Sequence, residues 1–249
     1  MPAVHIFAVA VLIGAAGASA QAPPRVTGVR VAEAFKVLEE REGPLSYTLA
    51  VRSVVSKTDG SDRKESESLE ALTRDAKGAT TVKVLKATRE GRDVTAEAQR
   101  DRDERLAAEA SARHDGGDEI SVGLVLPTGE DAGRFEFGPA TRVGSLLTTS
   151  FRPTPAHRGD ENIAEGTLAW DPTTHDPAWL EAVPVDLPRG ASELKIRFEF
   201  ARAGGLLYPA RTVTDGVGGI LWIKRRFQAE IAISDLRAGN APSSTPAGH

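Results

Sequence analysis

The clearest pattern along the chain is a strict alternation of apolar and polar side chains. At 194–200, Leu, Ile, Phe and Phe alternate with Lys, Arg and Glu, and a period of two places the four apolar side chains on one face of a strand. Residues 45–55 follow a similar pattern, and Asp59 and Gly60 come next as a hairpin signal. Further strands are predicted at 63–73, 80–87, 120–126, 134–137, 145–151, 165–170, 179–183, 193–201, 206–214 and 220–236.

Two segments have helical spacing instead. Val31, Phe35 and Leu38 lie at i, i+4 and i+7, which predicts a packing helix that ends at the next glycine–proline pair. Residues 95–113 are rich in Ala, Arg and acidic residues, and Leu106 is their one large apolar side chain. Because such a helix can bury little, we expect it on the surface.

Together these patterns predict a mainly β protein with about eleven antiparallel strands and two helices. Strict alternation exposes one face of each strand to solvent and buries the other. An open sheet of that many strands must curl or split. Since the chain has no midpoint linker, we expect one strongly curved sheet. The folded domain is predicted at 30–237, after a flexible lead at 21–29 and before a disordered tail at 238–249.

The first twenty residues have the features of a secretory signal peptide. Residues 6–16 form an apolar run that is too short to span a bilayer, which needs about 20 residues. The small residues Ala18 and Ala20 flank Ser19 as a cleavage site before Gln21. The alternative is a buried N-terminal helix. The chain has no cysteine, and therefore neither disulfides nor a thioether-linked lipid. We expect a periplasmic or secreted protein without a transmembrane segment, cleaved after Ala20.

Composition and motifs argue against several functions. The net charge is −4, and no basic stripe interleaves with aromatic residues, so nucleic acid is not expected as a partner. His157 and His175 each lie near carboxylates in predicted loops, but without the ligand spacing of a metal site. No Gly-x-Ser-x-Gly motif is present. The glycine-rich segment 216–219 is predicted to join two strands, and Arg225 to mark a bulge. We expect no catalysis, metal or cofactor.

Five short motifs resemble those of one known family. They are KATREGRDVTAEAQ at 86–99, FRP at 151–153, GTLAWD at 166–171, GLLYP at 205–209 and ISDLR at 233–237. In order and spacing they are similar to segments of outer-membrane lipoprotein-sorting proteins, the LolA/LolB-like carriers, over most of the chain. The resemblance implies an incomplete antiparallel β-barrel with helices over its open side.

In such carriers a hydrophobic concavity holds lipoprotein acyl chains. The resemblance therefore implies a non-enzymatic periplasmic binding protein for a lipid or lipoprotein acyl chain. A buried methylene contributes about 0.8 kcal/mol, so this function needs no catalytic residue. For each lining residue the alternative is ordinary core packing against the first helix. The side chains expected to line the concavity are Leu49, Val51, Leu168, Trp170, Leu194, Ile196, Phe198, Phe200, Phe227 and Ile231.

Two other functions remain open at this stage. The first is a cell-envelope scaffold with a filled β core and no small-molecule ligand, in which the helix at 95–113 or a strand edge binds another protein. Deleting 95–113 separates it from a carrier, because a scaffold loses its partner while lipid binding stays intact. The second is a hydrolase that uses His157 or His175, which unchanged activity in a double alanine variant would exclude.

Overall fold

The computed structural model describes residues 23–39, 43–115, 124–187, 190–220 and 223–239. The predicted signal peptide at 1–20 lies outside the described residues, as do residues 240–249 of the predicted tail. The first residue of that tail, Ala238, ends the last strand of the sheet, so the folded part reaches one residue beyond its predicted end.

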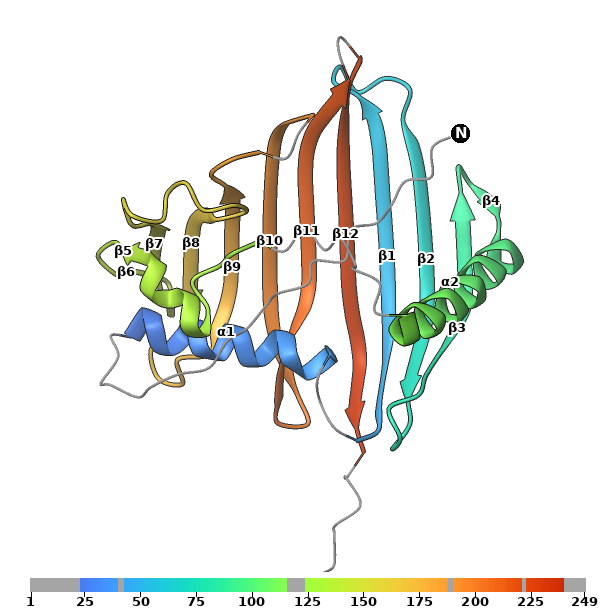
Figure 1. Cartoon of the computed structure of the whole chain (residues 1–249), viewed down its shortest axis with the longest axis horizontal. Helices are drawn as coiled ribbons and strands as arrows, with labels where there is room; N and C mark the ends of the chain where they lie inside the picture. The colour runs from blue at the N-terminus through green and yellow to red at the C-terminus, as the bar shows by residue number, and fades with distance from the viewer. Residues whose placement is uncertain (1–22, 40–42, 116–123, 188–189, 221–222, 240–249) are drawn as a thin grey trace, which may run out of the picture.

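Twelve strands form one sheet in which neighbouring strands pair antiparallel (Figure 1). The order is β4-β3-β2-β1-β12-β11-β10-β9-β8-β7-β5, with β6 beside β7, so the first and last strands lie together in the middle. In the described part of the chain the end strands β4 and β5 do not pair with each other, and the sheet stays open. A mainly β fold on one open antiparallel sheet is thus confirmed, with twelve strands in place of about eleven. The strands are β1 (Leu45–Lys57), β2 (Lys64–Arg74), β3 (Thr80–Arg89), β4 (Arg92–Asp93), β5 (Phe135–Phe137), β6 (Thr141–Val143), β7 (Leu146–Pro153), β8 (Ala164–Trp170), β9 (Pro177–Pro184), β10 (Ala191–Ala203), β11 (Leu206–Ile220) and β12 (Ile223–Ala238).

Helix α1 (Pro23–Glu39) crosses one face of the sheet and contacts β11 and β9. The predicted flexible lead at 21–29 is wrong from Pro23 onward. Proline fits the first position of a helix because the N–H it lacks has no partner there. The helix also packs closely at this end, since a Cβ on Gly28 would lie 2.2 Å from the carbonyl oxygen of Pro127. Val31, in the predicted packing position, is fully buried.

Helix α2 (Thr95–Asp115) confirms the charged helix predicted at 95–113. It packs on β3, and Figure 1 shows α1 and α2 on the same side of the sheet, with the lower part of β12 and β1 between their facing ends. A short 3-10 helix, η1 (Gly129–Arg134), contacts α1. None of the described helices combines the length and the apolar character needed to cross a membrane.

The glycine-rich segment at 216–219 does not join two strands. It lies inside β11, where Gly216 pairs with Leu194 on one side and Phe227 on the other. A Cβ on Gly216 would come within 2.3 Å of the Phe227 ring, so glycine here leaves room for a neighbouring side chain rather than making a turn. β11 continues to Ile220 and β12 begins at Ile223.

The bulge predicted at Arg225 is wrong, and most of the strand predicted at 120–126 lies outside the described residues. Arg225 causes no bulge, since it lies in regular register between Lys57 and Gly218. Its guanidinium pairs with Asp62 at 2.6 Å, and this ion pair accounts for a charge on an otherwise apolar face. In the strand predicted at 120–126, the described residues contribute only an isolated parallel bridge, Val125 to Ile163.

Candidate functional site

The pairing register shows which side chains share the helix side of the sheet. Val51 of β1 lies opposite Ile231 of β12, Ile231 lies opposite Thr212 of β11, and Thr212 lies opposite Phe198 of β10. Directly opposed residues of antiparallel strands point to the same face. The Phe35 ring of α1 packs on Phe198. The side chains of Val51, Ile231 and Phe198 therefore point to the face that carries the helices.

Under α1 this face is filled by the protein's own side chains. The Phe35 ring meets Phe198 and Phe200 edge to face, with ring centroids 5.1 and 5.8 Å apart. Leu168 and Trp170 of β8 are fully buried in the same cluster. These residues therefore agree with the alternative considered from the sequence, in which they pack as ordinary core against the first helix and do not line a ligand site. Six of the ten predicted lining residues lie in or against this core: Leu168, Trp170, Leu194, Ile196, Phe198 and Phe200.

The other four predicted lining residues lie on β1 and β12, outside this core. Leu49, Val51, Phe227 and Ile231 are each half-buried, and neither apolar cluster of the described residues includes them. Val55 lies opposite Phe227 and is also half-buried. These five side chains lie on one face of the adjoining strands β1 and β12, with Ser53 and Ala229 between them, and we call the five the apolar strip.

A buried ion pair lies beside one end of the apolar strip. Glu70 of β2 is directly opposite Leu49 and is only 6% exposed. Its carboxylate accepts hydrogen bonds from the guanidinium of Arg102 on α2 and, at 3.4 Å, from the hydroxyl of Ser68. The Arg102 side chain is 21% exposed. Since the pair joins α2 to the sheet, it fixes the helix next to the apolar strip.

Two more polar residues complete this charged cluster. Arg74 of β2 lies opposite Leu45, close to Tyr47 on β1. Burial raises the pKa of the Tyr47 phenol, and the positive charges of Arg74 and Arg102 oppose that rise. Sequence analysis did not single out Tyr47, Glu70, Arg74 or Arg102. The available signal was the hairpin at Asp59 and Gly60, because its pairing register sets Glu70 opposite Leu49.

Two side chains of α2 replace a strand along the edge of β3. The Gln99 side-chain amide donates to the carbonyl of Val82 at 3.1 Å and accepts from the N–H of Val84 at 2.7 Å. The Thr95 hydroxyl oxygen accepts from the N–H of Ala87 at 2.9 Å. Exposed strand edges promote pairing with other chains, so these contacts both hold α2 in place and cover the edge.

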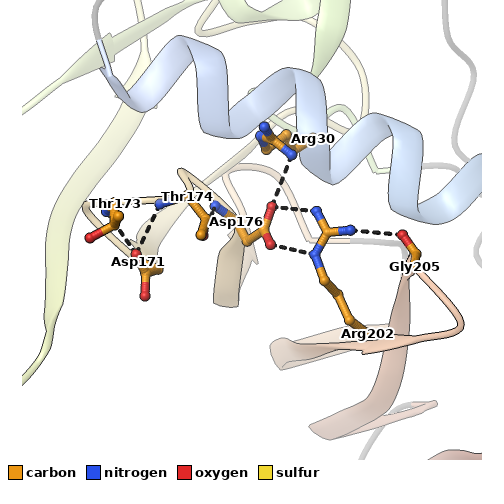
Figure 2. A network of polar contacts seen from close by, with 7 residues as sticks. All are labelled: Arg30, Asp171, Thr173, Thr174, Asp176, Arg202 and Gly205. Carbon is orange, nitrogen blue, oxygen red and sulfur yellow. Dashed lines mark hydrogen bonds and ion pairs between the residues drawn. The ribbon is translucent and has the colours of Figure 1, made fainter.

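Asp176, in the connection between β8 and β9, holds α1 in place, far along the sheet from α2 but on the same face (Figure 2). Its carboxylate accepts two hydrogen bonds from Arg202 of β10, at 2.5 and 2.8 Å, and one from Arg30 of α1 at 3.0 Å. The hydrogen bonds from Arg202 lower the pKa of Asp176, and Arg202 also donates to the carbonyl of Gly205 at 2.8 Å. Asp171 accepts hydrogen bonds from the backbone N–H groups of Thr173 and Thr174, which hold the loop predicted around His175 as a turn.

The outer face of the sheet, away from the helices, carries rows of paired charges. Arg211 donates to Glu230 at 2.7 Å and to Glu199 at 3.5 Å. Glu199 also accepts from Arg197 at 3.0 Å, and the Arg197 guanidinium lies 4.5 Å from the ring centroid of Trp179. Paired charges keep this face hydrated, in contrast to the apolar strip.

Two surface pockets have mixed, charged linings. One of about 340 Å³ includes Arg52 and Glu230, and one of about 620 Å³ includes Asp215 and Arg226. In the second, Arg226 and Asp215 pair with each other at 3.6 Å. Because opposite charges in these linings compensate one another, we expect neither pocket to select an apolar ligand.

The two histidines considered for chemistry have local partners. His157 Nδ1 lies 2.9 Å from the Asp160 carboxylate in one loop, and His175 adopts a left-handed backbone conformation, φ 58°, in the turn beside Asp176. Within the described ranges, no group of three or more His, Cys, Asp or Glu side chains is placed to hold a metal ion.

Comparison with known proteins finds solved structures but no match to a family model or to a curated protein. A domain of Vibrio parahaemolyticus named for outer membrane lipoprotein sorting is 13% identical, with 88% of this chain and 95% of that chain covered and a TM-score of 0.34. A DUF1329 family protein from Desulfovibrio piger is 10% identical, with 88% and 94% covered and a TM-score of 0.36. The Pseudomonas aeruginosa MucA/MucB complex gives 10% identity, 87% and 100% coverage and a TM-score of 0.22. The Vibrio domain bears the name of the family that the sequence motifs resemble. All three TM-scores lie below 0.5, so function is inferred from the geometry of this chain's own residues.

Proposed function

We propose that this protein is a non-enzymatic periplasmic binding protein that holds a lipid or lipoprotein acyl chain on the apolar strip. One observation carries the proposal. On the helix side of the sheet, Leu49, Val51, Val55, Phe227 and Ile231 are half-buried and belong to neither apolar cluster of the described residues, whereas the outer face is lined by ion pairs. An acyl chain would complete the burial of the strip.

The apolar area of an acyl chain sets the scale of the binding energy. A buried methylene contributes about 0.8 kcal/mol, so a sixteen-carbon chain that buries half its surface on an open strip would gain about 6 kcal/mol. Ordering the chain costs part of this gain. Contacts from α2 on the other side of the ligand would add to it.

The N-terminal segment supports the proposed compartment. Its apolar run and the Ala-Ser-Ala site before Gln21 have the form of a cleaved export signal. We propose that the chain is exported, is cleaved after Ala20 and acts in the periplasm.

Native mass spectrometry with organic extraction tests the proposal directly. The full chain would be expressed in a bacterial host and purified from the periplasm without detergent. We expect a stoichiometric adduct that extracts as a fatty acid or a phospholipid. A clean apo mass and no uptake of added hexadecanoate would contradict the proposal and indicate that the apolar strip is closed in solution.

A matched pair of variants locates the site. Ile231→Asn places a polar group on the apolar strip, whereas Ala232→Asn makes a change of similar polarity on the outer face of the same strand. We expect the first variant to lose the adduct and the second to keep it. Equal loss in both would show that the adduct depends on fold stability rather than on the apolar strip.

The alternative function, a scaffold that binds another cell-envelope protein, draws on one observation. Beyond the turn that contacts β3, the described side chains of α2 are mostly exposed and largely charged. Deleting 95–113 discriminates between the two functions. A scaffold would lose its partner and keep any lipid adduct, while a carrier would lose lipid retention because the apolar strip would lose one of its flanking helices.

A further inference from the structure

We propose that the opening between β9 and β10 binds an extended peptide segment of another protein, which pairs as an added strand with the free edge of β10. The opening is the larger of the two surface pockets described above, about 620 Å³, and residues of both strands and of their connection line it. The inference does not depend on the proposed acyl-chain function, because the apolar strip lies on β1 and β12.

β10 continues past the end of its pairing with β9, and this leaves a free strand edge inside the sheet. β10 pairs with β11 along its whole length, but it pairs with β9 only from Ile196 to Glu199. On the β9 side, residues 191–195 therefore have no strand partner in the described part of the chain. Five residues of an extended strand are about 16 Å long. Unpaired N–H and C=O groups along such an edge are the groups that bind an added strand.

The opening exists because β9 stays with β8 where it leaves β10. Pro184 pairs with Ala164 of β8, and the next residue, Val185, donates its N–H to the carbonyl of Ile163 at 2.8 Å. Pro184 has no N–H to offer to β10. The two arms of the β9–β10 connection thus separate, and among the described residues no strand fills the space between them.

The apolar side chains around the opening indicate which peptide fits. Val183 and Leu187, each 38% exposed, are two of the five large apolar side chains that the described residues expose, and both line the opening. Leu194 and Val185 also line it and pack against the main apolar cluster. Every second side chain of a strand beside β10 would lie next to Leu194, on the same face. An apolar residue at that position would extend the core.

The charges of the opening set the register of the peptide. Three basic and three acidic side chains line the opening, so their charges compensate: Arg158, Lys195, Arg226, Glu165, Glu193 and Asp215. On the free edge itself, Lys195 pairs with Glu181 at 2.8 Å, whereas the Glu193 side chain is 67% exposed and lies 4.0 Å from Arg226. Opposite charges directly across neighbouring strands are stabilising. The peptide position opposite Glu193 therefore favours a basic residue, next to the apolar residue at Leu194.

Calorimetric titration with a synthetic hexapeptide tests the proposal. The peptide acetyl-Thr-Val-Lys-Val-Thr-Val-amide alternates polar and apolar residues and carries one lysine. We expect it to bind and to slow hydrogen exchange of the amides at 191–195. Its N-methylated counterpart has the same side chains but no backbone donors, and should bind at least about tenfold more weakly. Glutamate in place of the lysine should weaken binding about threefold.

A matched pair of variants locates the site. Leu187→Asn removes an exposed apolar side chain of the opening, and Leu85→Asn removes one on β3 that is 46% exposed. Because neither side chain is buried, both variants should fold. We expect the affinity for the peptide to fall about fivefold in Leu187→Asn and to stay unchanged in Leu85→Asn.

The opposite results would overturn the inference. Equal binding of the N-methylated peptide would overturn the added strand, and equal losses in the two leucine variants would overturn its location. No binding at about 1 mM peptide, with unchanged exchange at 191–195, would overturn the site as a whole. Displacement of the peptide by hexadecanoate would also overturn it, since the opening would then hold an acyl chain. Uptake of hexadecanoate without peptide binding would leave the proposed function in place, so the two proposals fail separately.

Discussion

Replacing Phe198 by alanine tests whether the sheet face under α1 is packed core. The matched replacement of Phe227 tests whether the apolar strip is open to a ligand. Phe198 is 2% exposed, and the Phe35 ring packs on it edge to face with centroids 5.1 Å apart. Truncating a buried phenylalanine to alanine costs about 3–5 kcal/mol because it removes apolar contacts and leaves a cavity. The matched change Phe227→Ala, on the half-buried apolar strip, removes roughly half as much buried area and should cost about 2 kcal/mol.

Urea and thermal unfolding give the measurement. In a domain of this size each kcal/mol lowers Tm by about 2–4 °C, so Phe198→Ala should melt about 10 °C below the wild type and Phe227→Ala about 5 °C below it. Hexadecanoate uptake, measured at a temperature where both variants are folded, should fall in Phe227→Ala and stay near the wild-type level in Phe198→Ala.

The opposite pattern would refute this division of the sheet. If Phe198→Ala melts no lower than Phe227→Ala and loses hexadecanoate uptake, then the space under α1 accepts ligand, and the six side chains placed in the core there are ligand-lining after all. The wild-type protein with saturating hexadecanoate is the reference, because a ligand that binds only the folded state raises its Tm.

Three further predictions concern the contacts that hold the helices and the sheet. Because Arg202 lowers the pKa of Asp176, the contribution of this ion pair to stability is present above the ordinary aspartate pKa of about 4 and is lost as pH falls through the lower folded-state pKa. Urea unfolding at pH 7 and pH 3 should therefore show a smaller loss of stability on acidification in Asp176→Asn than in the wild type, and an equal loss would contradict the assignment. Gln99→Ala leaves two backbone groups of β3 without their side-chain partners, so hydrogen exchange along β3 should speed up; unchanged exchange would mean that water replaces the amide at no cost. Gly166→Ala should cost more than about 3 kcal/mol, because the new Cβ would lie 1.9 Å from a backbone carbonyl of β9, whereas Gly159→Ala, with no atom within 4 Å, serves as the near-neutral control.

The local sequence pattern predicted strands well where apolar and polar residues alternate strictly, because only an extended strand has that period. The alternation at 194–200 gave β10 because a period of two has no other regular explanation. Glycine was less informative. The glycine-rich segment 216–219 was expected to join two strands, yet Gly216 lies mid-strand with the Phe227 ring against it, and a sequence does not distinguish a glycine needed for a turn from one needed for close approach.

The candidate site was predicted only in part, for a related reason. The ten residues expected to line a concavity do lie on one face, as the alternation required. The alternation does not indicate which of them the core encloses, and six lie in or against the cluster that includes Val31 and Phe35 of α1. Tyr47, Glu70, Arg74 and Arg102 were missed because each is ordinary in its local sequence. They become a cluster when β1, β2 and α2 come together.

The sequence by itself determined that this protein is mainly β, that the alternating apolar side chains of strands such as β10 share one face of the sheet, and that a charged helix follows the third strand. These properties depend on neighbours a few residues away, which the backbone period fixes directly. Only the tertiary structure decided that β1 pairs with β12. This pairing places Val51 directly opposite Ile231, although the two residues are far apart in the sequence. The tertiary structure also decided that Arg102 meets Glu70 at the end of the apolar strip. The physical reason is that pairing register and helix placement are set by long-range packing, which a local pattern does not encode.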